Sequence, residues 1–343
     1  MSNTYLLIVF AGAIIISYNL SQLVKWAALS LGIVDNPAVS ERKIHKNTTP
    51  LLGGIAIFVT FFTVLFFNKN LLLSGDLEIE HWLGFFIGSF ILIIGGVLDD
   101  KYNLSPARQL IFPVLATTAV IIGGVEIEKI TNPFGGVLQL SGLFSGVVIA
   151  IWIIGMTYTT KILDGLDGLV SGVSAIGGLI IFFFTMSSRY YQPDIAFASL
   201  VLSGAAIGFL ILNWHPAKIF LGEGGSLFLG FALGVLSIIS GGKLAIALAI
   251  MIVPILDVAW SIIRRAYGGK NPFKSSDRKH LHHRLLDFGL SQRQVSAVFY
   301  FMAFFFGLMA VFLQSAGKVL LLIFLVVIIS GIFYFLNSFK VHS

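Results

Sequence analysis

The sequence predicts an all-α protein that crosses a membrane many times. Of its 343 residues, 57% are hydrophobic and 11% are charged, and the mean hydropathy is +0.95. Soluble domains carry about a quarter charged residues, so an ordinary water-soluble domain is excluded. Uncharged runs recur along the chain, and about 20 apolar residues in a helix span the hydrocarbon core of a bilayer. Cysteine is absent, which excludes disulfides, thiolate catalysis and Cys-ligated metals.

Eleven apolar runs are long enough to cross a membrane as helices. They occupy residues 4–23, 51–67, 82–98, 108–124, 144–160, 169–186, 195–212, 226–240, 244–263, 295–313 and 318–337. Only a few residues, including Gly241 and Gly242, separate two of these runs, so ten spans is the alternative count. No cationic residue precedes Lys25, which favours a retained first span over a cleaved signal peptide.

The distribution of Lys and Arg predicts the side of the membrane on which each connecting segment lies. If the first span runs from outside to inside, the inner segments hold 17 of the 22 Lys and Arg residues and the outer segments hold 5. The positive-inside rule then places the N-terminus outside and the C-terminus in the cytoplasm. We therefore expect one transmembrane domain over residues 1–343 in the plasma (inner) membrane. Its functional site should be formed on the cytoplasmic face by loops 24–50, 99–107, 161–168, 213–226 and 264–294.

Carboxylates near the inner ends of the predicted helices are the first candidates for function. A carboxylate at membrane depth costs about 2.5–3.5 kcal/mol, so it usually faces a polar cavity or a partner. Grouped carboxylates without cysteine favour Mg²⁺ or Mn²⁺, which also bind substrate phosphates. Structural salt bridges to nearby lysines are the alternative for any single acid. These acids are Asp99, Asp100, Asp164, Asp167 and Glu223.

Two glycine-containing motifs surround three of these acids. Asp164 and Asp167, in Asp-Gly-Leu-Asp-Gly, are three residues apart and can share a metal on one side of a helical turn. A turn between two helices is the alternative, because Asp-Gly is common in turns. Residues 221–226, Leu-Gly-Glu-Gly-Gly-Ser, form a Gly-rich segment before a helix, whose free N–H groups suit a phosphate. Such glycines also serve helix packing in membranes.

A histidine cluster lies in the longest basic inner loop. Residues 277–284 read Asp-Arg-Lys-His-Leu-His-His-Arg. We expect the Arg and His side chains to recognise a diphosphate. Zinc binding is one alternative, but neither cysteine nor an H-E-x-x-H motif is present to complete a tetrahedral site. An anchor for anionic lipid headgroups is the alternative, and it explains the cations but not three histidines.

Five motifs in order along the chain resemble those of one enzyme family. They lie within residues 35–54, 95–100, 164–169, 213–226 and 280–285. Together they resemble the polyprenyl-phosphate N-acetylhexosamine-1-phosphate transferases (glycosyltransferase family 4). These integral membrane enzymes move a sugar-1-phosphate from a UDP-sugar onto a lipid phosphate. The resemblance covers most of the chain, and the ordered set is far more specific than any single motif.

The resemblance implies a role for each candidate. Asp99 and Asp100 would position or deprotonate the lipid phosphate, and Asp164, Asp167 and Glu223 would line the Mg²⁺ and diphosphate site, as catalytic residues or metal ligands. The implied substrate-binding residues are Lys43, His45, Lys46 and Lys161 for phosphates, Asn213 and Phe220 for uracil, and His280, His282, His283 and Arg284 for the nucleotide-sugar.

Two residues depart from the family pattern. Members often have Asn where this chain has Lys161 and Asp where it has Glu223. A protonated lysine cannot ligate Mg²⁺, so one usual ligand is lost. The longer Glu223 then either reaches the ion or pairs with Lys161, and an inactive member is a further alternative.

The implied reaction is attack of undecaprenyl (polyprenyl) phosphate on a UDP-sugar with release of UMP, the first membrane step of cell-envelope polysaccharide assembly. The histidine loop and residues 254–257 favour UDP-N-acetylglucosamine, and the UDP-MurNAc-pentapeptide of peptidoglycan synthesis is the alternative. A cation-coupled secondary transporter is the competing class, but it leaves the basic histidine loop without a role. The implied partners are the UDP-sugar, the lipid and the membrane, without nucleic acid, and a homodimer is left open.

Overall fold

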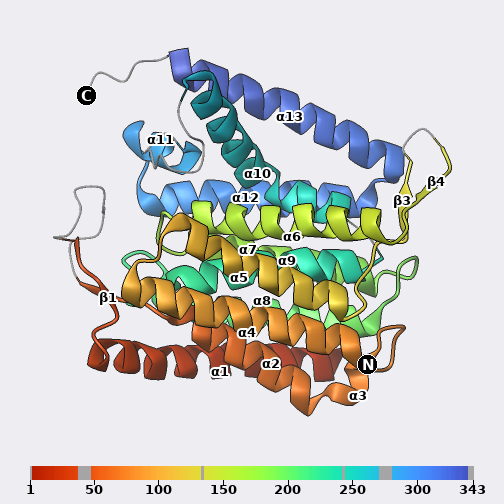
Figure 1. The fold of residues 1–343 in the computed structure, drawn as a ribbon, viewed down its shortest axis with the longest axis horizontal. Coiled ribbons are helices and arrows are strands. Elements are labelled where there is room, and N and C mark those ends of the chain that lie inside the picture. The colour runs from red at the N-terminus through yellow and green to blue at the C-terminus, as the bar shows by residue number, and fades with distance from the viewer. Residues whose placement is uncertain (1, 38–47, 133–134, 242–243, 270–279, 339–343) are drawn as a thin grey trace.

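The fold is a bundle of long helices with two short strand pairs (Figure 1). The computed structural model describes residues 2–37, 48–132, 135–241, 244–269 and 280–338. Within these residues, eight helices have the length and composition to cross a membrane, and three shorter apolar helices accompany them. The prediction of an all-α, multi-pass membrane protein is therefore confirmed, and these helices match the eleven predicted apolar runs.

The eight long helices supply most of the bundle. They are α1 (Asn3–Ser30), α4 (Ile79–Tyr102), α6 (Leu143–Leu163), α7 (Leu169–Met186), α8 (Pro193–Asn213), α9 (Gly222–Ile239), α10 (Leu244–Tyr267) and α12 (Gln292–Phe312). The others are α2 (Gly53–Phe67), α5 (Pro106–Ile122), α13 (Ser315–Ser338) and the short α3 (Lys69–Leu72) and α11 (Leu281–Asp287). Strands β1 (Val34–Asp35) and β2 (Thr49–Pro50) pair antiparallel, as do β3 (Lys129–Thr131) and β4 (Val137–Gln139).

Several helices extend beyond their predicted boundaries, among them α1, α4 and α9. Helix α1 continues seven residues beyond its predicted run, into the expected loop 24–50, and the chain turns at Gly32 with φ of +68°. Helix α4 extends to Tyr102, so Asp99 and Asp100 belong to its last turn and not to a loop. Helix α9 begins at Gly222, which places Glu223 in its first turn. At the ends of α4 and α9, the acidic side chains have partners on other helices: Asp99 bonds to Gln109 of α5, Asp100 to the N–H of Glu223, and Glu223 to Lys161 of α6.

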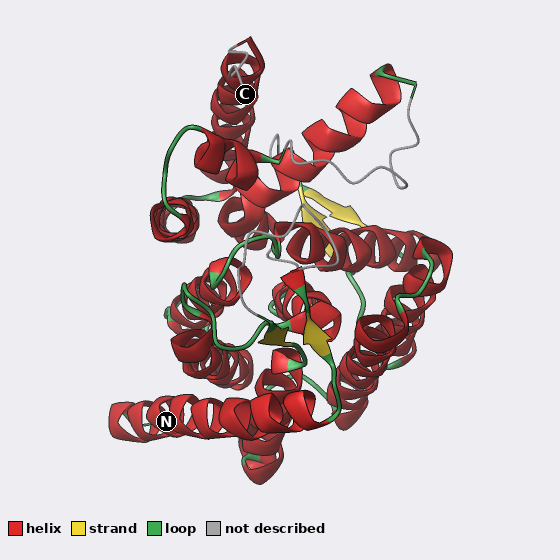
Figure 2. Cartoon of the chain, turned by 90° about the vertical axis from the view of Figure 1, so that its left-hand side faces the viewer, coloured by secondary structure: helices red, strands yellow, loops and turns green. Residues whose placement is uncertain are grey.

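The helices differ greatly in how much of their surface is covered by protein. In the most apolar part of α9, 89% of the residues are buried, against 17% in α1. Helix α9 therefore runs through the centre of the bundle, and most of α1 is left uncovered by the rest of the protein. In Figure 1 the start of α1 lies at the opposite end of the bundle from β1 and α11. Figure 2 looks onto the end that carries β1 and α11.

Glycine pairs hold the first turn of α9 against α2 and α4. A Cβ atom on Gly96 of α4 would lie 2.0 Å from the backbone nitrogen of Gly224, and one on Gly54 of α2 would lie 2.1 Å from the Cα of Gly225. Any side chain at these positions would collide with backbone, so the close approach requires glycine. The Gly-rich motif thus serves helix packing here, and this packing brings the ends of three helices together.

Candidate functional site

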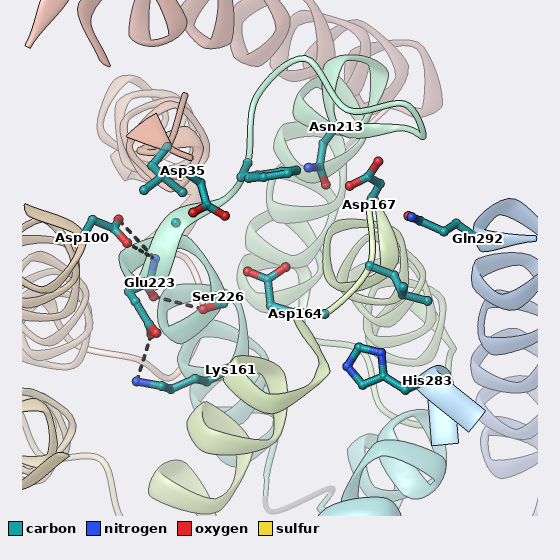
Figure 3. Close-up of a pocket in the computed structure, with 15 residues that line it drawn as sticks. Asp35, Asp100, Lys161, Asp164, Asp167, Asn213, Glu223, Ser226, His283 and Gln292 are labelled. Carbon is teal, nitrogen blue, oxygen red and sulfur yellow. Dashed lines mark hydrogen bonds and ion pairs between the residues drawn. The ribbon is translucent and has the colours of Figure 1, made fainter. Parts of the chain in front are cut away.

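A polar cavity of about 370 Å³ lies where these helix ends meet (Figure 3). Segments distant in sequence supply its walls, including the ends of α4 and α6, the α6–α7 and α8–α9 connections, α11 and the start of α12. The lining residues are Asp35, Leu51, Asp100, Lys161, Asp164, Gly165, Leu166, Asp167, Asn213, Phe220, Gly222, Glu223, Ser226, His283 and Gln292. The cavity therefore gathers residues from each of the five motifs singled out in the sequence.

Asp100 is fixed against the start of α9. Its two carboxylate oxygens accept the backbone N–H of Glu223 at 3.1 and 3.2 Å. This N–H is one of the donors that the first turn of a helix leaves unsatisfied, and a carboxylate there is also favoured by the helix dipole. The left-handed Gly222, with φ of +70°, permits this contact, since a Cβ would lie 2.5 Å from an Asp100 oxygen.

Glu223 forms an ion pair across the cavity wall. Its Oε2 lies 3.0 Å from Nζ of Lys161, and both side chains are partly accessible. Lys161 also donates to Oε1 of Gln109 at 2.8 Å. The alternative in which Glu223 pairs with Lys161 is thus the arrangement that the structure has.

Asp99 lies behind the cavity and does not line it. The side chain is 8% exposed. Its carboxylate accepts the backbone N–H of Leu104 at 2.7 Å and the Gln109 amide at 3.0 Å from both oxygens. Asp99 is connected to the cavity by hydrogen bonds through Gln109, which bonds both to Asp99 and to the cavity residue Lys161. The two adjacent acids of α4 therefore have different surroundings, although the sequence presents them as an equivalent pair.

Asp164 and Asp167 come from the connection between α6 and α7. No hydrogen bond or ion pair with the described residues reaches the side chain of Asp164, which is accessible from the cavity. The surrounding protein nevertheless removes hydration, and this burial raises the pKa of Asp164 well above its ordinary value. The carboxylates of Glu223, Asp100 and Asp167 raise that pKa further.

Asp167 has partners on the loop after α8. Its Oδ2 lies 2.6 Å from Nδ1 of His215 and accepts the backbone N–H of Ala217 at 3.0 Å. His215 is in turn connected to α12, because Arg293 donates to its carbonyl oxygen at 2.9 Å. These bonds hold one oxygen of Asp167, so the carboxylate is oriented by the loop that leads to α9.

The side-chain amide of Asn213 forms hydrogen bonds with three other groups of the protein. Its Oδ1 accepts from the backbone N–H of Gly168 at 3.1 Å and from Ser171 at 3.0 Å, and its Nδ2 donates to the carbonyl of Ile219 at 2.9 Å. Asn213 therefore ties the Asp-Gly-Leu-Asp-Gly turn to the segment before α9. Phe220 is held by β2, because its N–H donates to the carbonyl of Pro50 at 2.9 Å, and its ring lines the cavity.

The histidine cluster divides into three different environments. His280 lies 3.0 Å from the buried Asp257 of α10, whose other oxygen accepts the N–H of Leu281 at 3.0 Å. His282 is 1% exposed, and burial, followed by its two histidine neighbours, lowers its pKa well below the ordinary value. Only His283 of the three lines the cavity. The bonds of Asp257 to His280 and Leu281 thus hold the start of α11 in place, and His283 of this helix lines the cavity.

The remaining predicted residues are placed as follows. Arg284 lies on α11, partly exposed and outside the cavity lining. Lys43, His45 and Lys46 fall in residues 38–47, outside the described part of the chain.

Three functional candidates were missed by the sequence interpretation. His215 stands inside the 213–220 motif, so its position was a usable signal for a partner of Asp167. Gln109 and Gln292 gave no such signal, because each is a single amide at a helix end. In Figure 3, Gln292 extends from α12 toward the cavity opposite Lys161.

The donor set of the cavity fits a hard divalent ion. Asp164 is a carboxylate without a partner among the described residues, and carboxylate oxygens are what Mg²⁺ prefers. No three described His, Asp and Glu side chains lie close enough to enclose an ion together. Mg²⁺ does not require this, since one or two carboxylates usually bind it together with waters and substrate phosphates.

Comparison with known proteins identifies the family. The model of glycosyl transferase family 4 matches residues 82–241. A Bacillus subtilis (strain 168) protein named "Probable undecaprenyl-phosphate N-acetylglucosaminyl 1-phosphate transferase" is 35% identical over 303 residues, 87% of this chain and 82% of that protein.

Two further relatives come from other bacteria. The "Decaprenyl-phosphate N-acetylglucosaminephosphotransferase" of Mycobacterium tuberculosis (strain CDC 1551 / Oshkosh) is 31% identical over 84% of this chain and 77% of its own length. An "Undecaprenyl-phosphate alpha-N-acetylglucosaminyl 1-phosphate transferase" of Thermotoga maritima is 33% identical over 78% of each chain. The resemblance seen in the motifs is confirmed, and this multi-pass membrane protein belongs to glycosyl transferase family 4.

Proposed function

We propose that this protein transfers N-acetylglucosamine-1-phosphate from UDP-N-acetylglucosamine to undecaprenyl or another polyprenyl phosphate and releases UMP. The observation that carries the proposal is the acid-lined cavity at one end of the bundle, built from the ends of apolar helices. A lipid-anchored phosphate and a water-soluble nucleotide can meet only at such a boundary. The names of the bacterial relatives support N-acetylglucosamine and a polyprenyl acceptor.

The reaction forms one P–O bond and breaks another. An oxygen of the lipid phosphate attacks the β-phosphorus of the UDP-sugar, and the bond from that phosphorus to the bridging oxygen breaks. UMP leaves with the electron pair. Positioning and charge neutralisation provide most of the catalysis, because both reactants are anions. Asp100, oriented by the N–H of Glu223, is suited to accept the proton of a singly charged lipid phosphate.

Mg²⁺, which Mn²⁺ can replace, is the proposed cofactor. Asp164 and Asp167 would hold it, since Asp164 has no partner among the described residues and Asp167 keeps one oxygen unused by His215 and Ala217. When bound, the ion supplies positive charge to phosphate oxygens. His283 and Gln292, on the other side of the cavity from Lys161, are placed to contact the nucleotide-sugar (Figure 3).

We place the cavity on the cytoplasmic side of the inner membrane. The predicted inner segments carry 17 of the 22 Lys and Arg residues of the sequence, and the described parts of those segments lie at the cavity end of the bundle. Nucleotide-sugars are cytoplasmic metabolites. The long isoprenoid tail of the acceptor remains in the lipid, which explains why the acids lie at helix ends and not in the bundle centre.

The test is an assay of the purified, full-length protein in detergent. UMP release is measured with undecaprenyl phosphate, Mg²⁺ and either UDP-N-acetylglucosamine or UDP-MurNAc-pentapeptide. We expect release with the first donor only, and loss of release without the lipid. Release with the second donor alone would reassign the protein to the peptidoglycan branch. No release with either donor, from protein that unfolds cooperatively on heating, would contradict a transferase and favour a transporter.

A further inference from the structure

An ion pair joins Lys161 and Glu223 on one wall of the cavity. Nζ and Oε2 are 3.0 Å apart, and both side chains are mostly buried, with 19% and 29% exposure respectively. Both residues line the cavity (Figure 3). The positive charge of Lys161 is therefore neutralised by the carboxylate of Glu223.

The ammonium group is held in one place by a chain of polar contacts behind it. Gln109 Nε2 donates to both Asp99 oxygens at 3.0 Å and to the carbonyl of Leu104 at 2.9 Å. These acceptors fix the orientation of the amide, so its Oε1 must face Lys161, which donates to it at 2.8 Å. Asp99 thereby acts on the cavity through Gln109.

The charge of the cavity lining makes this ammonium important for an anionic ligand. Among the described lining residues, five are carboxylates and Lys161 is the one Lys or Arg side chain. An ammonium has three N–H donors, and Gln109 and Glu223 take two of them. The third is available to a phosphate oxygen, and lysine is a common point-charge ligand of phosphates.

We infer that Lys161 is a built-in cation of this enzyme, which occupies the Glu223 side of the cavity in place of a divalent ion and binds a substrate phosphate there. The inference rests on the proposed function. A divalent ion bound at Glu223 would have to displace Lys161 or lie beside an ammonium of the same sign, and like charges at such distances repel strongly. The divalent ion is therefore confined to Asp164 and Asp167, and Glu223 is not one of its ligands.

The experiment measures Mn²⁺ binding by electron paramagnetic resonance on the purified, full-length protein in detergent. The variants are Glu223→Gln, Lys161→Met and Asp164→Asn. Lys101→Met is the matched control, because Lys101 lies at the end of α4, is exposed and does not line the cavity. Thermal unfolding verifies that each variant is folded, and Lys161→Gln replaces Lys161→Met if the latter is not.

The expected results separate the two sides of the cavity. Glu223→Gln should change Mn²⁺ affinity by less than threefold, and Lys161→Met should bind one additional Mn²⁺ because it frees Glu223. Lys101→Met should match the wild type. Without divalent ions, Lys161→Met should also bind UDP at least tenfold more weakly than the control does.

Three results would overturn the inference: a loss of Mn²⁺ affinity of threefold or more in Glu223→Gln, no additional ion in Lys161→Met, or unchanged UDP binding in Lys161→Met. The Asp164→Asn variant tests the proposed metal site separately. Unchanged Mn²⁺ affinity in this variant would contradict the proposed cofactor site, whatever the Lys161 variants show.

Discussion

Replacing Gly96 by alanine should disrupt the site although no polar side chain is changed. The added Cβ would lie 2.0 Å from the nitrogen of Gly224, so α4 and α9 must separate by about 1.4 Å to restore an ordinary contact of 3.4 Å. The bonds from the Glu223 N–H to Asp100, at 3.1 and 3.2 Å, would then be lost. Overpacking costs about 1–3 kcal/mol and a hydrogen bond to a charged group about 1.5–3 kcal/mol, whereas the gain in helix propensity is about 1 kcal/mol.

The assays are thermal unfolding in detergent and UMP release. We expect a lower unfolding temperature and at least about a 100-fold loss of activity, because a displacement near 1 Å can cost this much. Gly155→Ala is the control, since no atom outside its own helix backbone lies within 4 Å of its added Cβ. If Gly96→Ala matched this control in both assays, the glycine contact could not be what holds Asp100 against α9.

Three further predictions concern the metal site and the histidine loop. Asp164→Asn should lower UMP release at least about 100-fold with little change in unfolding temperature, because it removes charge stabilisation worth several kcal/mol; activity within tenfold of the wild type would exclude Asp164 as a ligand. The affinity of the wild type for Mn²⁺, measured by titration, should rise with pH and then level off, because the ion competes with a proton at a carboxyl whose pKa is raised; a pH-independent affinity would contradict this competition. Asp257→Ala should destabilise the protein by about 1–3 kcal/mol in thermal unfolding, because His280 and the N–H of Leu281 lose their acceptor. An exposed acid, Asp287→Ala, is its control, and equal stability of the two variants would show that Asp257 does not anchor α11.

Hydropathy predicted which segments are helices but not where each helix lies in the bundle. Helix α9 is almost wholly covered by other helices and α1 is mostly uncovered, yet their most apolar stretches have similar mean hydropathies of 1.6 and 1.9. Lipid tails are as apolar as a protein interior, so composition does not distinguish a central helix from a peripheral one. The glycines at 54, 96, 224 and 225 carried the missing information, since only they permit backbones to approach this closely.

The motifs predicted which segments come together at the cavity. The role of each residue there depends on its hydrogen-bond partners, which the motifs did not predict. Asp100 and Asp164 line one cavity as expected, although they are 64 positions apart. Asp99 does not line it, because its carboxylate points to Gln109 on α5, a helix that no motif connects with α4. Asn213 lines the cavity, and its amide is bonded to the backbone of Gly168 and Ile219, which the sequence did not predict. Such pairings depend on contacts between helices, which periodicity along one helix does not reveal.

Lys161 and Glu223 are best understood together, as the means by which this wall of the cavity balances its charge. A carboxylate facing anionic reactants must be neutralised, and either a divalent ion or a side-chain cation can do this. A lysine supplies that charge permanently, but its long side chain needs support to keep the ammonium near the carboxylate. Gln109, oriented by Asp99, provides this support from behind. The acid that lies outside the cavity therefore has a physical reason to be there: it sets the direction of the amide that holds the cation.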